Sequence, residues 1–188
     1  MNTEKVLPGI DTSARIAATC ILGAGIEAAM AWRFGWSSAL PAFLALGAAG
    51  AVVTITDLAT HKIPEATVVP AYLLAAVLLA IGSAPRGQWW ALARGGIAMA
   101  SLGGFYLVLG LAFPSQFGIG DIELGGLLGL YLGWLGWSAL SGGTLAAWLL
   151  AALSLPAHHV LDHGTRRGAL AAGPFLMGGA LVAVLVSS

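Results

Sequence analysis

The sequence has very few charged residues. Only 9% of its 188 residues are Asp, Glu, Lys or Arg, against about 25% in an ordinary soluble domain. A chain with so few charges cannot cover a water-exposed surface, so a soluble globular protein is excluded. The eight basic residues are balanced by eight acidic ones, and there is no excess positive charge to attract nucleic acid. We therefore expect no nucleic-acid partner.

Cysteine is almost absent as well. Cys20 is the single cysteine of the chain, which excludes an intramolecular disulfide and any site built from a pair of cysteines. Apolar residues are abundant instead, at 59% of the chain, and the mean hydropathy is +0.90. This composition predicts a polytopic helical membrane protein surrounded by a lipid bilayer.

Long apolar runs predict where the helices lie. A helix needs about 20 apolar residues to cross about 30 Å of hydrocarbon, and continuous runs favour helices over a membrane barrel. Seven runs reach or approach this length: 16–32, 39–56, 66–82, 95–113, 122–137, 140–155 and 168–186. We expect an all-α bundle of about seven transmembrane helices, with six to eight as the range. It forms one integral-membrane domain over residues 1–188, and the chain turns between the fifth and sixth runs at residues 141–143.

The basic residues predict the orientation in the membrane. With seven crossings, one side carries Lys5, Arg15, Lys62, Arg166 and Arg167, and the other carries Arg33, Arg86 and Arg94. The side richer in Lys and Arg faces the cytoplasm, which places the N-terminus there in a multi-pass protein of the cell (inner) membrane. Six tryptophans near the ends of the runs are expected to anchor the helices at the interfaces: Trp32, Trp36, Trp89, Trp90, Trp134 and Trp137.

Two aspartates stand at the ends of apolar runs. Asp57 follows the second run and Asp121 opens the fifth. The third and fourth runs form a hairpin, so both aspartates should lie at the same membrane face. Two carboxyl groups held close share one proton: the ionised one activates water, and the protonated one polarises a peptide carbonyl. The pair indicates aspartic proteolysis with water as the nucleophile and with no metal or organic cofactor.

A purely structural role remains an alternative for each aspartate. An acidic side chain is favourable in the first turn of a helix, which is where Asp121 is expected. Asp57 would then lie in a polar loop beside Lys62.

Glycine and proline surround both aspartates. We expect Gly118 and Gly120 to allow a close backbone approach or a positive φ just before Asp121. Ile63 and Pro64 define the entry into the third run, because Pro favours an extended residue before it and a helix start after it. Further glycines at four-residue spacing predict tight packing along one side of the fifth run: Gly125, Gly129 and Gly133.

These motifs together resemble the type IV prepilin peptidases, which are membrane-embedded aspartic proteases of the GxGD kind. The matching pieces are Asp57 with Ile63-Pro64, the Gly-Ile-Gly-Asp sequence at 118–121, and the Gly-Pro-Phe-Leu sequence at 173–176. Their order and spacing agree over roughly residues 40–185. The resemblance implies that Asp57 and Asp121 are the catalytic pair, and that Ile63, Pro64, Gly118, Gly120 and Glu123 are motif or substrate-binding positions.

The resemblance also implies a substrate. Such enzymes remove the leader from type IV pilin-like or pseudopilin precursors at the cytoplasmic face, so a precursor protein is the expected partner. Glu65 replaces the usual Asn of the family, and Glu123 replaces its usual Lys. Both changes make the surroundings of the pair more negative. The chain also lacks the cysteine-containing region that accompanies N-methyltransfer in many members, so we expect the short form, which acts as a peptidase only.

Other polar residues leave alternatives open. His158, His159, Asp162 and His163 form either a metal site, since His159 and His163 are four residues apart, or a solvated loop beside the neighbouring arginines, which we favour. Glu27 lies inside the first run and is expected to face the bundle interior or a water pocket. The rival function is a proton- or cation-coupled transporter or a non-catalytic scaffold. The protease is favoured because both aspartates lie at the ends of runs and no inverted repeat is visible.

Overall fold

The computed structural model describes residues 12–60, 65–114, 116–161 and 172–187. These residues form seven α-helices and one 3-10 turn, without a strand. The helices are α1 (Thr12–Phe34), α2 (Leu40–Thr60), α3 (Glu65–Ser83), α4 (Trp89–Ala112), α5 (Ile119–Leu135), α6 (Trp137–Leu161) and α7 (Gly173–Val186), with η1 (Ala84–Arg86) between α3 and α4. The predicted all-α bundle is confirmed.

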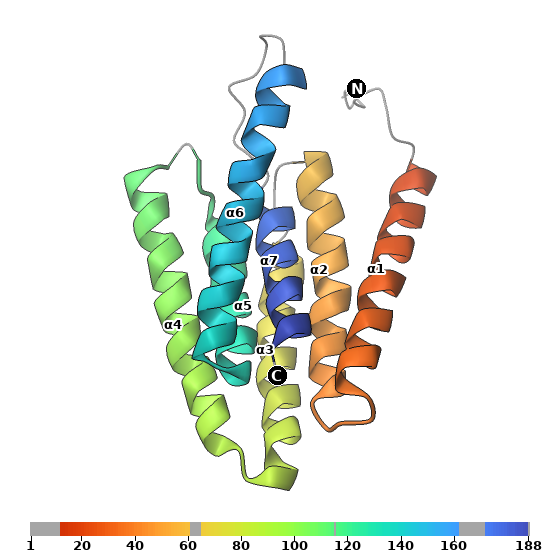
Figure 1. Ribbon diagram of the computed structural model, residues 1–188, viewed down its shortest axis with the longest axis vertical. Helices are drawn as coiled ribbons and strands as arrows, with labels where there is room; N and C mark the ends of the chain where they lie inside the picture. The colour runs from red at the N-terminus through yellow and green to blue at the C-terminus, as the bar shows by residue number, and fades with distance from the viewer. Residues whose placement is uncertain (1–11, 61–64, 115, 162–171, 188) are drawn as a thin grey trace, which may run out of the picture.

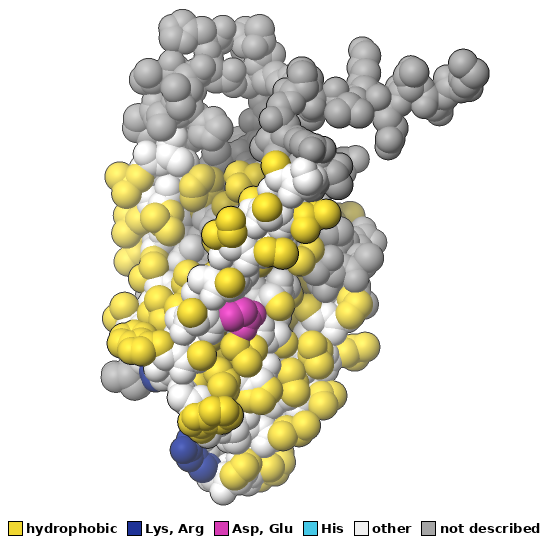
Figure 2. All heavy atoms as spheres, turned by 90° about the vertical axis from the view of Figure 1, so that its right-hand side faces the viewer, with side chains coloured by type: hydrophobic (Ala, Val, Ile, Leu, Met, Phe, Trp, Pro, Cys, Tyr) yellow, Lys and Arg dark blue, Asp and Glu magenta, His cyan; other side chains and the backbone are white. Residues whose placement is uncertain are grey.

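Four of the described helices are long and apolar enough to cross a membrane, namely α1, α2, α4 and α6. Two further apolar stretches, Pro70–Arg86 and Gly173–Val186, are shorter. The apolar helices indicate a membrane protein, while the expected count of seven crossings remains a prediction. Figure 2 shows how apolar side chains cover the described surface on the side of α1.

Successive helices run in opposite directions (Figure 1). The C-terminal ends of α2, α4 and α6 therefore gather at the same end of the bundle as the N-terminal ends of α3, α5 and α7. We call this the upper end, as it is drawn in Figure 1. The predicted hairpin of the third and fourth runs corresponds to α3 and α4, which η1 joins at the lower end.

Helix α5 is the centre of the bundle. Every residue from Leu124 to Trp134 is buried, and α5 packs against α3, α4, α6 and α7. Its glycines allow α4 to approach closely: a methyl group added at Gly129 would lie only 2.6 Å from the carbonyl oxygen of Ala98. An added methyl would likewise collide with Tyr106 at Gly125 and with Ala98 at Gly133. The tight packing predicted for this glycine row is confirmed.

The connection between α5 and α6 differs from the prediction. Helix α5 ends at Leu135, Gly136 is extended (φ 161°, ψ 165°), and α6 begins at Trp137. The turn expected at residues 141–143 is wrong, because these residues lie inside α6. Gly143 instead gives α7 room to pack, since an added methyl there would lie 3.4 Å from the carbonyl oxygen of Gly179.

Two arginines bind the last carbonyl groups of α5 and α7. Arg94 donates from Nε to the Gly133 carbonyl at 2.6 Å and from Nη2 to the Trp134 carbonyl at 2.6 Å. Arg33 donates to the carbonyls of Val184, at 3.2 Å, and Ser187. Carbonyl groups at a helix end have no partner inside the helix, and these guanidinium groups supply one.

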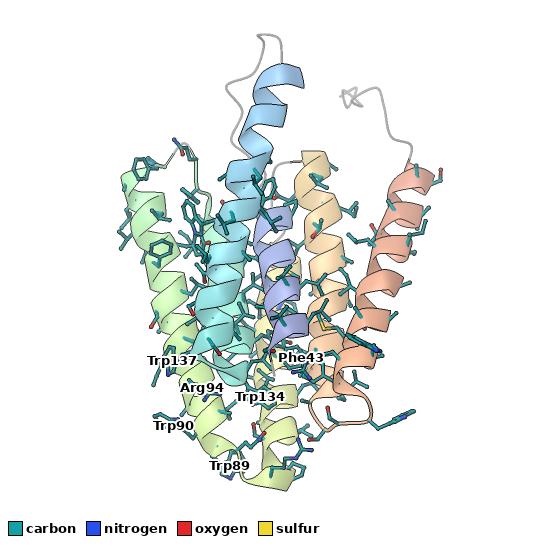
Figure 3. The ribbon with its side chains drawn as sticks, viewed as in Figure 1. Phe43, Trp89, Trp90, Arg94, Trp134 and Trp137 are labelled. Atoms are coloured by element: carbon teal, nitrogen blue, oxygen red, sulfur yellow. The ribbon has the colours of Figure 1, made fainter. Side chains whose placement is uncertain are left out.

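Trp134 is part of the core rather than an interfacial anchor. Its indole N–H donates to the Ser83 hydroxyl at 2.8 Å, and its ring lies 6.0 Å from that of Phe43. Figure 3 shows it beside Arg94 in the lower half of the bundle. The anchoring role predicted for Trp134 is therefore wrong. The other five tryptophans of that set are exposed: Trp32, Trp36, Trp89, Trp90 and Trp137.

Glu27 lies where α1 meets α2. It is the only acidic residue of α1, and an acidic side chain appears in the middle of the otherwise apolar face in Figure 2. A methyl group added at Gly47 of α2 would lie 2.9 Å from Glu27 Oε1. The side chain is partly exposed, so the expectation that it faces the bundle interior holds only for the part against α2.

Candidate active site

Asp57 lies in the last turn of α2 and is buried. Only 4% of its surface is exposed. The helix continues through Asp57 to Thr60, because Leu58 and Ala59 are good helix formers and no glycine or proline interrupts them. The alternative of a polar loop position for Asp57 is therefore wrong.

The Asp57 carboxylate is bound by the first residue of α7. The backbone N–H of Gly173 donates to Asp57 Oδ2 at 2.9 Å, and the contact is buried. A methyl group added at Gly173 would lie 2.7 Å from the same oxygen. Because real Cβ atoms do not approach an oxygen so closely, only glycine fits here without displacing the carboxylate.

Asp121 lies in the first turn of α5 and is held by its own turn. Its Oδ2 accepts the N–H of Gly118 at 2.9 Å, and its own N–H donates to the Gly118 carbonyl at 3.1 Å. Gly118 is extended (φ −92°, ψ 171°) and exposed, and Gly120 belongs to the helix. Of the two alternatives expected for these glycines, a close backbone approach or a positive φ, the positive φ is excluded, since the described glycines with positive φ are Gly35 and Gly87.

The structure brings Asp57 and Asp121 together at the upper end. Burial raises the pKa of the Asp121 carboxyl above its ordinary value. The Gly118 N–H lowers that pKa in part, and the charge of the nearby Asp57 raises it. Burial and a neighbouring negative charge both favour the protonated form of a carboxyl group. Asp121 is thus a carboxyl that releases its proton less readily than an isolated aspartic acid does, with a second carboxyl nearby.

Tyr106, a neighbour of Asp121, belongs to an aromatic cluster formed by α4, α6 and the chain before α5. Tyr106 is close enough for the Asp121 charge to act on it, and its hydroxyl hydrogen-bonds with the Trp148 indole. Phe117, which directly precedes the Gly-Ile-Gly-Asp sequence, lies 6.2 Å from each of these two rings. Phe105 lies 6.3 Å from Trp148. Tyr106 thus connects Asp121 to a cluster of four aromatic side chains.

An apolar groove of about 830 Å³ runs between α4 and α6. Phe105 and Trp148 of the aromatic cluster line this groove. Its hydroxyl groups bond to their own helices, as when Thr144 donates to the Leu140 carbonyl at 2.8 Å. The groove therefore presents a mainly apolar surface.

Glu123 lies on another side of α5 from Asp121. Two residues along a helix correspond to a rotation of about 200°. The hydroxyl of Tyr72, from α3, donates to the Glu123 carbonyl at 2.6 Å, and the Glu123 charge acts on Tyr72. The extra carboxylate thus adds its charge on the α3 side of the site.

Several predicted positions fall outside the described part of the chain. Ile63, Pro64, Asp162 and His163 are not among the described residues, nor are the side chains of Glu65, His158 and His159. Within the described residues, no three His, Cys, Asp or Glu side chains come together as metal ligands.

Sequence reasoning missed two residues of the site, Tyr106 and Trp148, and the contact that Gly173 makes. Tyr106 and Trp148 are apolar-run residues, and nothing in their spacing distinguishes them from neighbours that face lipid. Gly125, one helical turn after Asp121, was a usable signal, since it leaves the space that the Tyr106 ring fills. The Gly-Pro-Phe-Leu sequence at 173–176 belongs to the family resemblance, but it does not by itself predict the bond from Gly173 to Asp57.

Comparisons with known proteins found no match. No family model matches the chain, and no curated protein or solved structure is similar to it. The functional argument therefore depends on the geometry of the two aspartates and on the motifs around them.

Proposed function

We propose that the protein is a membrane-embedded aspartic endopeptidase that removes the leader from type IV pilin-like or pseudopilin precursors. One observation carries the proposal: Asp57 and Asp121 come from different helices, lie at the same end of the bundle, and are near enough for the charge of Asp57 to raise the pKa of Asp121. The motif resemblance to prepilin peptidases supports the choice of substrate. The basic residues support a cytoplasmic position for this end of the bundle.

The chemistry needs two carboxyl groups and one water molecule. The ionised carboxylate removes a proton from water as the oxygen attacks the peptide carbonyl carbon, and the protonated carboxyl donates its proton to the carbonyl oxygen. The tetrahedral intermediate then collapses. The amide nitrogen receives the proton taken from water, the C–N bond breaks, and the second carboxyl recovers its proton. One water is consumed, and one carboxylic acid and one amine are formed.

The upper end also suits the expected substrate. The leader of such a precursor is basic and precedes an apolar helix. Glu123 adds a negative charge beside the pair that shares one proton, and complementary charge favours association with a basic leader. The scissile peptide must be extended to expose its carbonyl to the attacking water.

Substitution of the two aspartates tests the proposal. Asp57→Asn and Asp121→Asn should each reduce cleavage of a co-expressed pilin-like precursor by at least about a hundredfold, the usual contribution of an acid or base. Asn keeps the shape of Asp but can neither hold the shared proton nor accept one from water. The double variant should be no worse than either single one, because the two groups act as a unit. Precursor size on a gel is the measurement.

Two further variants serve as controls for carboxyl groups outside the pair. Glu27→Gln removes a carboxyl that lies on α1, against Gly47 and about 15 Å along α2 from Asp57, and should leave cleavage unchanged. Glu123→Lys restores the charge usual in the family and should alter activity far less than either Asn variant. Cleavage that persists in both Asn variants would contradict the proposal. Asp-dependent proton movement in liposomes, without cleavage by the wild type, would establish the transporter instead.

A further inference from the structure

The two aspartates are held in different ways. Asp57 is almost completely buried and receives its N–H from α7, which is distant in the sequence. Asp121 is half-buried and receives its N–H from its own turn. The pair is therefore asymmetric before any substrate binds.

The first turn of α7 offers a single free donor, and Asp57 takes it. Pro174 has no N–H. The N–H groups of Phe175 and Leu176 both donate to the Ala172 carbonyl, at 3.1 and 3.0 Å. Only the Gly173 N–H is left, and it points to Asp57 Oδ2. The Gly-Pro-Phe-Leu sequence thus directs one backbone donor to one carboxylate.

A backbone N–H favours the ionised form of the carboxylate that it binds. An N–H can only donate, and an ionised carboxylate only accepts. Hydrogen bonds to a charged acceptor are about twice as strong as neutral ones. Protonation of Asp57 would weaken its buried bond to Gly173.

We propose that the Gly173 N–H is a positioning group that fixes Asp57 as the general base and leaves the shared proton on Asp121. This inference rests on the proposed function. In the first step, Asp57 accepts the proton of the attacking water and Asp121 gives its proton to the peptide carbonyl oxygen. In the second step, Asp57 passes its proton to the amide nitrogen, the C–N bond breaks, and Asp121 recovers a proton from the tetrahedral intermediate.

The pH profile of a Gly173→Ala variant tests the positioning role. The added methyl would lie 2.7 Å from Asp57 Oδ2, so the carboxylate must move away from the N–H. Loss of a hydrogen bond to a charged group should shift the acidic limb of the kcat/KM profile upward by about one pH unit. The alkaline limb, which reports Asp121, should stay in place. Cleavage of a purified precursor in liposomes is the measurement.

Gly178→Ala is the matched control on the same helix. Its added methyl would meet only the end of the flexible Leu150 side chain, at 3.2 Å, and its profile should match that of the wild type. A purely structural role for Gly173 would lower the rate equally at every pH. An unshifted acidic limb in Gly173→Ala would therefore overturn the proposal.

A second measurement locates the proton without any cleavage assay. The chain has four aspartates, Asp11, Asp57, Asp121 and Asp162, so Asp11→Asn and Asp162→Asn leave only the pair. With ¹³C-labelled aspartate, infrared spectra of this background should show one protonated carboxyl at neutral pH, and Asp121→Asn should remove that band. A band that survives Asp121→Asn would overturn the assignment, even where Gly173→Ala does not fold. Absence of cleavage with the expected spectra would count against the peptidase function alone.

Discussion

At the scale of single residues, the proton of Asp121 affects the stability of the fold as well as the proposed cleavage reaction. It lies in a turn that favours its charge, since Gly118 donates an N–H to it. Burial and the Asp57 charge outweigh this bond and raise its pKa. The folded protein therefore binds this proton more tightly than the unfolded chain does.

The first prediction concerns stability as a function of pH. The pKa of Asp121 is higher in the folded protein than in the unfolded chain, so binding of this proton increases the free energy of unfolding. This contribution is fully present at pH values below the unfolded pKa. It is lost as the pH rises through the folded pKa. Asp121→Asn removes the titrating group, so its unfolding free energy should fall less with rising pH than that of the wild type. Thermal unfolding in detergent micelles from acid to neutral pH measures both slopes, and equal slopes would contradict the prediction.

The acids of the site were predictable from the sequence, whereas their partners were not. Asp57 and Asp121 stand out because charges are so rare in this chain, and the alternating direction of the helices puts them at one end. Gly173 and Tyr106 act through contacts between helices, and such contacts leave no local pattern. Gly118 is the opposite case, in which the sequence pattern is prominent but the contact is ordinary. Its position before Asp121 suggests a special role for glycine, yet it contributes only a backbone N–H that any residue except proline could supply.

At the scale of helices, the spacing of glycines in α5 determines how closely α4 packs. The backbone of α4 at Ala98 and Met99 faces Gly129, so an added methyl would meet atoms that cannot rotate away. Gly104, on α4 itself, has no atom within 4 Å of an added methyl. The two glycines therefore form a matched pair, one required by packing and one not.

The second prediction uses this pair. Gly129→Ala should destabilise the protein by about 1–3 kcal/mol, the usual effect of overfilling a packed core. Gly104→Ala should be neutral or stabilising by up to about 1 kcal/mol, because alanine is the better helix former. Thermal or denaturant unfolding in micelles compares the two variants. Equal destabilisation by both would show that the α4–α5 contact tolerates a methyl group.

The positions of the helices were largely predictable from the sequence. The misplaced turn between the fifth and sixth runs results from the interpretation of glycines. Apolar runs separated by polar residues located all seven helices, since each run must satisfy its backbone within a helix. The turn was placed at residues 141–143 because consecutive glycines commonly mark loops. Here they lie inside α6 and one of them packs against α7, while the chain reverses at the single Gly136. Sequence alone does not separate a packing glycine from a turning one.

At the scale of the whole molecule, the two ends of the bundle differ in composition. Among the described residues, the acidic side chains Asp57, Asp121 and Glu123 lie at the upper end. The lower end holds Arg33, Arg94 and exposed tryptophans such as Trp89 and Trp90 (Figure 3). Such an asymmetric molecule has a defined orientation in a bilayer, and the predicted one places the aspartates in the cytoplasm.

The third prediction concerns this orientation. In a Cys20→Ala background, Gln116→Cys places a thiol at the exposed upper connection between α4 and α5, and Arg86→Cys places one at the exposed lower connection between α3 and α4. A membrane-impermeant maleimide should label position 116 only in inverted vesicles and position 86 only in intact cells. The reverse pattern would place the aspartates outside the cytoplasm. Labelling of both positions from one side would contradict the opposite ends seen in the bundle.

The hydrogen bonds at both ends of α5 and α7 have a consequence for the charge of the site. The dipole of a helix is equivalent to roughly half a positive charge at its N-terminus, so two helices that begin at the aspartates supply about one positive charge. A carboxyl pair that shares one proton carries one negative charge, and the two amounts cancel. Arg33 and Arg94 offset the opposite poles of the same two helices. Removing the last proton, or adding a second one, would leave about one uncompensated charge in a medium of low dielectric constant. The singly protonated state is therefore the one in which the pair and the two helix ends together carry no net charge.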